Sequence, residues 1–199
     1  MADRYRSFAD LAANEVEDFD YAVCCLARHS PVTVIAPHGG YIEPHTSDIA
    51  RVIAAERYNL CSFESMQAGR PHGDLHITSR HFDEPRCMNL VAGSKLVVAV
   101  HGCLDQGDPD TTLVGGLDWE LRDAIGTALS RAGFGTLTTG HRFPGTHPDN
   151  ICNRGSRGAG CQLEVPMSLR DRLGGDPALL ALFSAAVTSA IEQRLDAAH

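Results

Sequence analysis

The sequence predicts an α/β fold in which helices flank a mixed, largely parallel β-sheet. Short apolar stretches of strand length alternate along the chain with segments of helical periodicity, which is the pattern of this fold class. Several apolar stretches are uninterrupted, as is typical of strands that are covered on both faces. The 199 residues contain no internal repeat and no low-complexity linker. We therefore expect residues 1–199 to form one domain.

The N-terminal half is expected to open with a short helix and to continue mainly with strands. Phe8 and Leu11 share one side of the helical segment. Strands are expected at residues 21–27, 32–36, 59–64, 75–78 and 95–100, of which the last (KLVVAV) is the clearest buried strand. The sequence Pro-His-Gly-Gly at residues 37–40 is expected to end the second strand. A helix is expected from Thr46 or Ser47, since both are good N-caps.

The C-terminal half is expected to hold two helices and two further strands. The helices are expected at residues 119–132 and 177–198, the second with Asp176 as its N-cap and Pro177 at its first position. The strands are expected at residues 135–139 and 160–165. Residues 143–160 contain four glycines and two prolines and are expected to form a long irregular loop. Such loops in compact domains are usually functional or mobile.

Composition excludes several classes of protein. With 43% hydrophobic and 21% charged residues, the chain is that of a folded globular protein. The apolar runs look too short to span a bilayer, and a net charge of −8 disfavours nucleic acid as a partner. Acids occupy the first twenty residues where a signal peptide would be apolar, which predicts a cytoplasmic protein, although release by lysis fits equally. Seven scattered cysteines without a CxxC motif make a disulfide scaffold unlikely, and most are expected to be free, small buried hydrophobic side chains in a reducing compartment.

Chemically active side chains follow the predicted strands. His38 and His101 each end a strand and precede a glycine, Glu43 lies five residues after His38, and Glu164 lies within the strand expected at residues 160–165. Ligands of open α/β sheets bind at the carboxyl ends of strands, so we expect these side chains to converge. Two imidazoles and one carboxylate are the ligands of a catalytic zinc site with a fourth position for water. The same ligands also suit Mn, Fe or Co.

The motifs HGGYIEPHTSDIA, LHITSRHFDEP, VVAVHGC and NICNRGSRGAGCQLE, in this order, resemble the poly-γ-glutamate hydrolase family. The resemblance extends from about residue 5 to residue 170. Members are zinc-dependent hydrolases, some of them phage-associated, with a compact version of the zinc carboxypeptidase fold. The resemblance implies that His38, Glu43 and His101 bind Zn²⁺ and that Glu164 is the general base for a metal-activated water. The spacing of His38 and Glu43 is wider than in carboxypeptidases.

By the same resemblance the substrate is a γ-glutamyl amide in a chain of glutamate. A polyanion approaching an acidic protein requires a local basic patch. Arg154, in the motif NRG, is the first candidate because a guanidinium can bind a carboxylate with two hydrogen bonds. His76, in the motif HITS, alternates with apolar residues and is the second candidate for substrate binding. The remaining arginines of these regions are expected to be structural or surface residues: Arg80, Arg86, Arg142, Arg157 and Arg170.

Two other functions fit the same residues. The first is a small-substrate amidohydrolase or deacylase, acting for example on an N-acyl amino acid, which would need a pocket with a closed end. The second is a non-catalytic metal-binding descendant of a hydrolase, which the presence of Glu164 argues against. Cys103 is not expected to be a ligand, because a fourth protein ligand would close the metal site to water.

Overall fold

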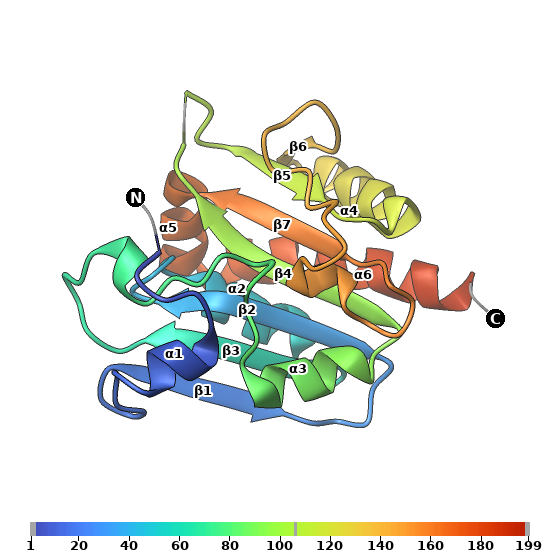
Figure 1. The fold of residues 1–199 in the computed structure, drawn as a ribbon. Coiled ribbons are helices and arrows are strands. Elements are labelled where there is room, and N and C mark those ends of the chain that lie inside the picture. Colours follow the sequence, from blue (N-terminus) through green and yellow to red (C-terminus); the bar gives the residue numbers. More distant parts are fainter. Residues whose placement is uncertain (1–2, 106, 198–199) are drawn as a thin grey trace.

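A seven-stranded β-sheet forms the centre of the computed structural model, which describes residues 3–105 and 107–197 (Figure 1). From one edge to the other, the strands are β1 (Tyr21–Leu26), β3 (Asn59–Ser65), β2 (Val32–Gly40), β4 (Leu96–Cys103), β7 (Cys161–Pro166), β5 (Thr111–Gly115) and β6 (Gly135–Leu137). The four central strands are parallel, whereas β1 pairs antiparallel with β3 and β5 pairs antiparallel with β7. The predicted mixed, largely parallel sheet is confirmed.

Helices cover both faces of the sheet (Figure 1). One face packs against α2 (Thr46–Ala54), α4 (Trp119–Arg131), α5 (Met167–Gly175) and α6 (Pro177–Asp196). The other face packs against α1 (Phe8–Ala12), α3 (Pro85–Ala92) and the loops around them. Strand β4 shows why its sequence is uninterrupted: Leu96, Val98 and Val100 belong to the first core, and Val97 and Ala99 to the second.

Several elements differ from the expectation. Residues 75–78 form no strand, because their backbone bonds outside the sheet: the Thr78 amide donates to Asp3 at 2.8 Å. The alternation in this segment arises because Leu75 and Ile77 are buried against the second core. Helices α3 and α5 and strand β5 were not expected. The start of α3 is fixed by the Glu84 side chain, which accepts a hydrogen bond from the Cys87 amide at 2.7 Å.

Helix α6 reaches the length and mean hydropathy of a membrane span, contrary to the expectation from the sequence. Among the described residues it is the one helix that does so. Its apolar side lies in the core that also contains α4, where Phe183, Val187, Ala190 and Ile191 are fully buried or nearly so. The packing of this core therefore accounts for the apolar residues on this side of the helix.

Two cysteines form a disulfide, so the expectation of free thiols is wrong for Cys61 and Cys87. The bond joins β3 to α3, whose first turn packs on the sheet at this point. Cys25 is the cross-strand partner of Cys61, and its Sγ lies 3.7 Å from the Sγ of Cys87. Strand register and helix position bring these three residues together, which spacing along the sequence does not reveal. The other five cysteines are free.

The disulfide leads to a first prediction. Alkylation of the unfolded, unreduced protein should modify five cysteines, and reduction should raise the number to seven, as counted by mass spectrometry. Because the bond closes a loop of 26 residues, reduction should lower the free energy of unfolding by about 3.5 kcal/mol. The variant Cys24→Ser, which leaves the bond intact, serves as the control. Seven alkylated cysteines before reduction would contradict the pairing.

Candidate metal centre and active site

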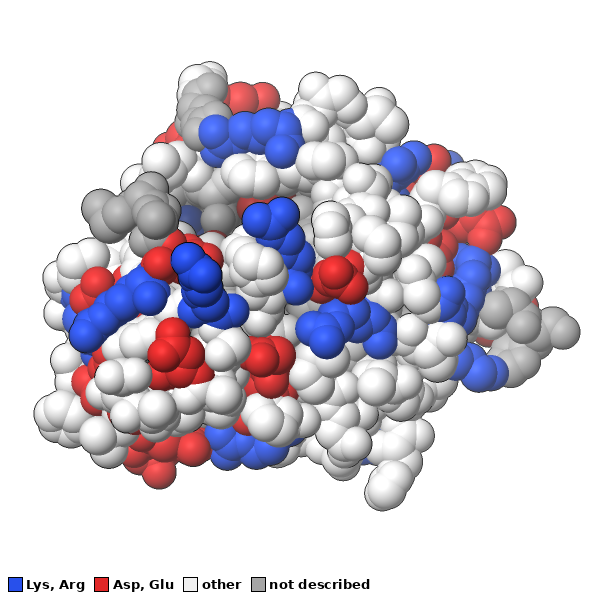
Figure 2. Space-filling model, viewed as in Figure 1, with Lys and Arg blue, Asp and Glu red and all other residues white. Residues whose placement is uncertain are grey.

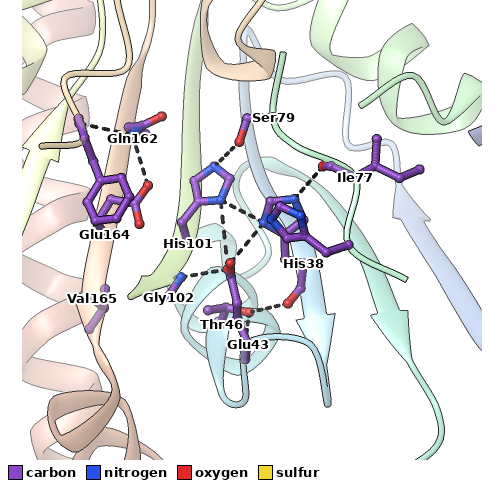
Figure 3. A network of polar contacts seen from close by, with 12 residues as sticks. His38, Glu43, Thr46, Ile77, Ser79, His101, Gly102, Gln162, Glu164 and Val165 are labelled. Atoms are coloured by element: carbon purple, nitrogen blue, oxygen red, sulfur yellow. Dashed lines mark hydrogen bonds and ion pairs between the residues drawn. The ribbon is translucent and has the colours of Figure 1, made fainter. Parts of the chain in front are cut away.

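Three side chains meet at the carboxyl ends of β2 and β4 (Figure 3). The Nδ1 atoms of His38 and His101 lie 3.2 Å apart. The Glu43 carboxylate lies 3.2 Å from His38 Nδ1 through Oε1 and 3.9 Å from His101 Nδ1 through Oε2. All three residues are buried, with exposed fractions of 2% for each histidine and 6% for Glu43. The convergence expected from the strand ends is therefore present.

A β-bulge directs His38 to this point. Strand β2 continues through Pro-His-Gly-Gly instead of ending there, and its register with β3 shifts between Ala36 and Gly39. Strict alternation from the buried Ile35 would place Pro37, and not His38, on the face of the sheet where His101 lies. The extra residue of the bulge reverses this alternation. The bulge also accommodates a proline in a central strand.

Glu43 is held by the turn between β2 and α2. Its backbone amide donates to the carbonyl of His38 at 3.0 Å, and its own carbonyl accepts a hydrogen bond from the Thr46 hydroxyl at 2.7 Å. The Gly102 amide donates to Glu43 Oε2 at 2.7 Å. The carboxylate is thus tied both to the start of α2 and to the end of β4.

The outer nitrogens of both imidazoles are occupied by the segment at residues 77–79. His38 Nε2 lies 2.8 Å from the carbonyl oxygen of Ile77, and His101 Nε2 lies 3.3 Å from the Ser79 hydroxyl. A carbonyl oxygen only accepts, so His38 donates from Nε2 and its Nδ1 lone pair points to the centre of the cluster when the ring is neutral. Partners of this kind orient metal-ligating histidines.

The donor set fits a zinc ion. Ligand atoms at about 2.1 Å from a tetrahedral zinc ion lie about 3.4 Å from one another, close to the separations between His38, Glu43 and His101. Burial lowers the pKa of His101 to about 3, which keeps this ring neutral. Burial opposes ionisation of Glu43, yet His38 holds the pKa of this carboxyl well below its usual value. A neutral imidazole and an ionised carboxylate are the states that bind metals. In spite of burial, Glu43 raises the pKa of His38, so this ring has to release its proton when a metal binds.

A third imidazole lies against the cluster. The rings of His76 and His38 are tilted by 39° with centroids 4.0 Å apart, and His76 Nδ1 lies 2.7 Å from Asp3 Oδ1. Burial, followed by the influence of His38, lowers the pKa of His76 to about 4. His38, Glu43 and His76 also lie close enough together to hold a metal ion. The structure thus offers His76 as an alternative to His101 for the third ligand.

Glu164 stands beside the cluster on β7. It is the register partner of His101 across the parallel pair of β4 and β7, and 8% of its surface is exposed. Its Oε1 accepts a hydrogen bond from Gln162 at 3.1 Å (Figure 3). Gln162 in turn accepts one from Asn150 at 2.8 Å. Burial, and then the negative charge of Glu43, raise the pKa of Glu164 well above its usual value.

These residues line a cavity of about 650 Å³. The surface is hollowed on the face seen in Figure 2, with basic side chains beside the hollow. The remaining walls include the exposed side chains of Arg80 and Arg142 and the partly buried ring of Phe143. Neither arginine forms an ion pair with an acidic residue of the described part of the chain.

Five of the six predicted site residues lie at this cavity: His38, Glu43, His76, His101 and Glu164. Arg154 does not line it. Its Nη1 donates to the carbonyl of Phe82 at 2.9 Å, which connects two loops. The basic residues of the cavity are Arg80 and Arg142, which the sequence interpretation assigned to the surface or to structural contacts.

Sequence reasoning missed the partners that orient the site. Gln162 precedes Glu164 by two residues and so shares its face of β7, a signal that strand periodicity contains. Ser79 lies in the motif HITS, in which His76 is the more conspicuous residue. Asn150 and Asp3 reach the site from distant loops, and no local pattern indicates them.

Comparison with known proteins agrees with the fold. A putative carboxypeptidase from Burkholderia mallei shares the fold with a TM-score of 0.52 and 16% identity, over 89% of this chain and 60% of that one. The chain thus has a carboxypeptidase-like architecture. More particularly, residues 5–179 match the family model described as poly-gamma-glutamate hydrolase, and the chain belongs to this family.

Similar proteins cover almost the whole chain. A bacteriophage poly-gamma-glutamate hydrolase superimposes with a TM-score of 0.91 and 27% identity, over 98% of this chain and 99% of that one. A structure described as zinc-free YndL superimposes with a TM-score of 0.86 and 32% identity, over 96% and 98% of the two chains. The UPF0714 protein YndL of Bacillus subtilis is 36% identical over 94% of this chain and 71% of its own length. The predicted family is confirmed.

Proposed function

We propose that this protein is a zinc-dependent hydrolase that cleaves the γ-glutamyl amide bonds of poly-γ-glutamate. The observation that carries the proposal is the convergence of His38, Glu43 and His101 in a cavity that Glu164 also lines. Family membership supports a hydrolase, and the name of the bacteriophage relative supports this polymer as the substrate. The description of one similar structure as zinc-free supports zinc as the metal.

His38 and His101 would hold the metal through their Nδ1 atoms and Glu43 through its carboxylate. A zinc ion in such a site polarises an amide carbonyl and makes a water molecule more acidic. Ile77 and Ser79 fix the orientation of the two rings, and the Gly102 amide fixes the carboxylate.

Glu164 is proposed as the proton carrier of the reaction. Its carboxylate accepts a proton from the attacking water and delivers it to the departing amine nitrogen. Gln162 holds one carboxylate oxygen in place during both transfers. The raised pKa of Glu164 favours the neutral acid in the metal-free protein. The positive charge of a metal ion held by the neighbouring ligands would favour the ionised carboxylate of Glu164, which is the form that the first proton transfer needs.

Arg80 and Arg142 are proposed to bind carboxylates of the substrate. Each residue of poly-γ-glutamate carries a free carboxylate, and guanidinium groups bind carboxylates strongly. Both arginines line the cavity, and neither forms an ion pair with a described acidic residue. By contrast Arg86, outside the cavity, pairs with Glu17 and Glu84. The local basic patch that a polyanionic substrate requires is thus assigned to these two residues.

A second prediction tests this assignment. Arg80→Ala and Arg142→Ala should each raise the KM for poly-γ-glutamate about 10-fold or more, because a charge-assisted hydrogen bond contributes about 1.5–3 kcal/mol. Arg131→Ala, a change at an exposed arginine that lies outside the cavity, serves as the control. The measurement is the initial rate of polymer shortening, followed by size-exclusion chromatography at several salt concentrations. An unchanged KM in both cavity variants would refute the assignment.

The same assay separates the other functions that the residues allow. A deacylase would cleave N-acyl amino acids and leave the polymer intact. A metal-binding descendant would bind Zn²⁺ and cleave neither substrate. Shortening of poly-γ-glutamate by the unmodified protein, with loss of the activity on chelation and recovery on addition of Zn²⁺, is the result that the proposal expects.

A further inference from the structure

Arg170 is a buried charge without an acidic partner. Its exposed fraction is 3%, and it forms no ion pair within the described residues. Its Nε donates to the carbonyl of Val165 at 3.0 Å, and its Nη1 donates to the carbonyl of Pro44. Burying a guanidinium is costly unless its surroundings compensate the charge. Burial lowers the pKa of Arg170, and the negative charge of Glu43 opposes this shift.

Each of the two accepting carbonyls belongs to the residue that directly follows a residue of the proposed site. Pro44 directly follows Glu43 in the turn between β2 and α2, and Val165 directly follows Glu164 on β7. Arg170 itself lies in α5, which begins right after β7. One side chain therefore links two segments that are more than a hundred residues apart in the sequence.

The guanidinium also touches the third segment of the site. A Cβ added to Gly102 would lie 2.5 Å from Cζ of Arg170 and 2.6 Å from its Nε. The glycine after His101 therefore makes room for Arg170. The same glycine donates its amide to Glu43, so the backbone that Arg170 contacts is the backbone that fixes this carboxylate.

We propose that Arg170 is a positioning residue. From the face of the sheet that α5 covers, it holds the segments bearing Glu43, His101 and Glu164 in one arrangement. The inference rests on the proposed function, because the arrangement matters for metal binding and for hydrolysis. A planar guanidinium donates in several fixed directions at once, whereas the ammonium of lysine is a point charge on a flexible stem. Lysine at this position would keep the positive charge but could not make both hydrogen bonds that link the segments.

The test compares Arg170→Lys with Arg194→Lys as a matched control. Arg194 is also a largely buried arginine, and its Nε lies 3.2 Å from Asp118 Oδ1, but it contacts none of the proposed site residues. We expect Arg170→Lys to weaken Zn²⁺ binding 10- to 100-fold in a chelator competition, the range for partners that orient metal ligands. It should also lower kcat more than it raises KM. Arg194→Lys should lower Tm and leave Zn²⁺ affinity unchanged.

Hydrogen exchange of the Gly102 amide provides a reading that needs neither metal nor substrate. In the metal-free protein this amide should exchange at least 10-fold faster in Arg170→Lys than in the unmodified protein and in Arg194→Lys. If Arg170→Lys does not fold, the same measurements are made on Arg170→Gln.

The results also separate the two proposals. Unmodified protein that binds no Zn²⁺ or cleaves no polymer would end the proposed function, and exchange at Gly102 would still decide the role of Arg170. Normal Zn²⁺ affinity together with normal exchange in the folded Arg170 variant would overturn the positioning role. A loss of Tm alone, equal to that of Arg194→Lys, would overturn it as well.

Discussion

Glu164→Gln is expected to lower kcat on poly-γ-glutamate by about 10²–10⁴-fold, the usual contribution of a general acid–base residue. The substitution keeps the size of the side chain and one oxygen that can accept the hydrogen bond from Gln162. The amide cannot accept the proton of the attacking water at the pH of the assay. The loss should therefore appear in kcat, and KM should change little.

Zn²⁺ binding separates this outcome from a collapse of the site. Glu164 is not one of the proposed ligands, so the variant should bind one equivalent of Zn²⁺ as the unmodified protein does. Glu64→Gln makes the same change on β3, where Glu64 contacts Ser62 and Arg51 outside the cavity, and should leave kcat unaltered. Normal kcat in Glu164→Gln would remove Glu164 from the proposed mechanism.

The sequence predicts the central sheet well because its strands are short, apolar and bounded by turns. The strands expected at residues 32–36, 95–100 and 160–165 correspond to β2, β4 and β7, which are the strands that carry the site. Their carboxyl ends lie together because parallel strands end at the same edge. The grouping of His38, His101 and Glu164 therefore follows from strand order and direction.

The parts that could not be predicted depend on contacts between distant segments. The bulge that turns His38 toward His101 lies in a Pro-His-Gly-Gly sequence that, on local criteria, ends a strand. The Cys61–Cys87 bond depends on how α3 packs against β3. Arg154 has the motif expected of a substrate ligand, yet its guanidinium is used to bind a carbonyl. Only the three-dimensional arrangement separates such an arginine from Arg80 and Arg142.

His101→Ala is expected to abolish stable Zn²⁺ binding, with a loss of affinity greater than the 10- to 100-fold typical of changes to the partners of metal ligands. In the unmodified protein, His101 Nδ1 faces His38 Nδ1 at 3.2 Å. Alanine leaves two protein ligands where a catalytic zinc site needs three. Hydrolysis should fall with metal occupancy, and metal content measured by mass spectrometry after gel filtration is the direct readout.

His76→Ala is the matched comparison, because His76 also lies close enough to His38 and Glu43 to serve as a ligand. Since His76 Nδ1 is already paired with Asp3, we expect this variant to retain Zn²⁺ within about 10- to 100-fold of the original affinity, as for a partner outside the ligand set. Zinc loss in His76→Ala together with zinc retention in His101→Ala would reverse the assignment. The ligands would then be His38, Glu43 and His76.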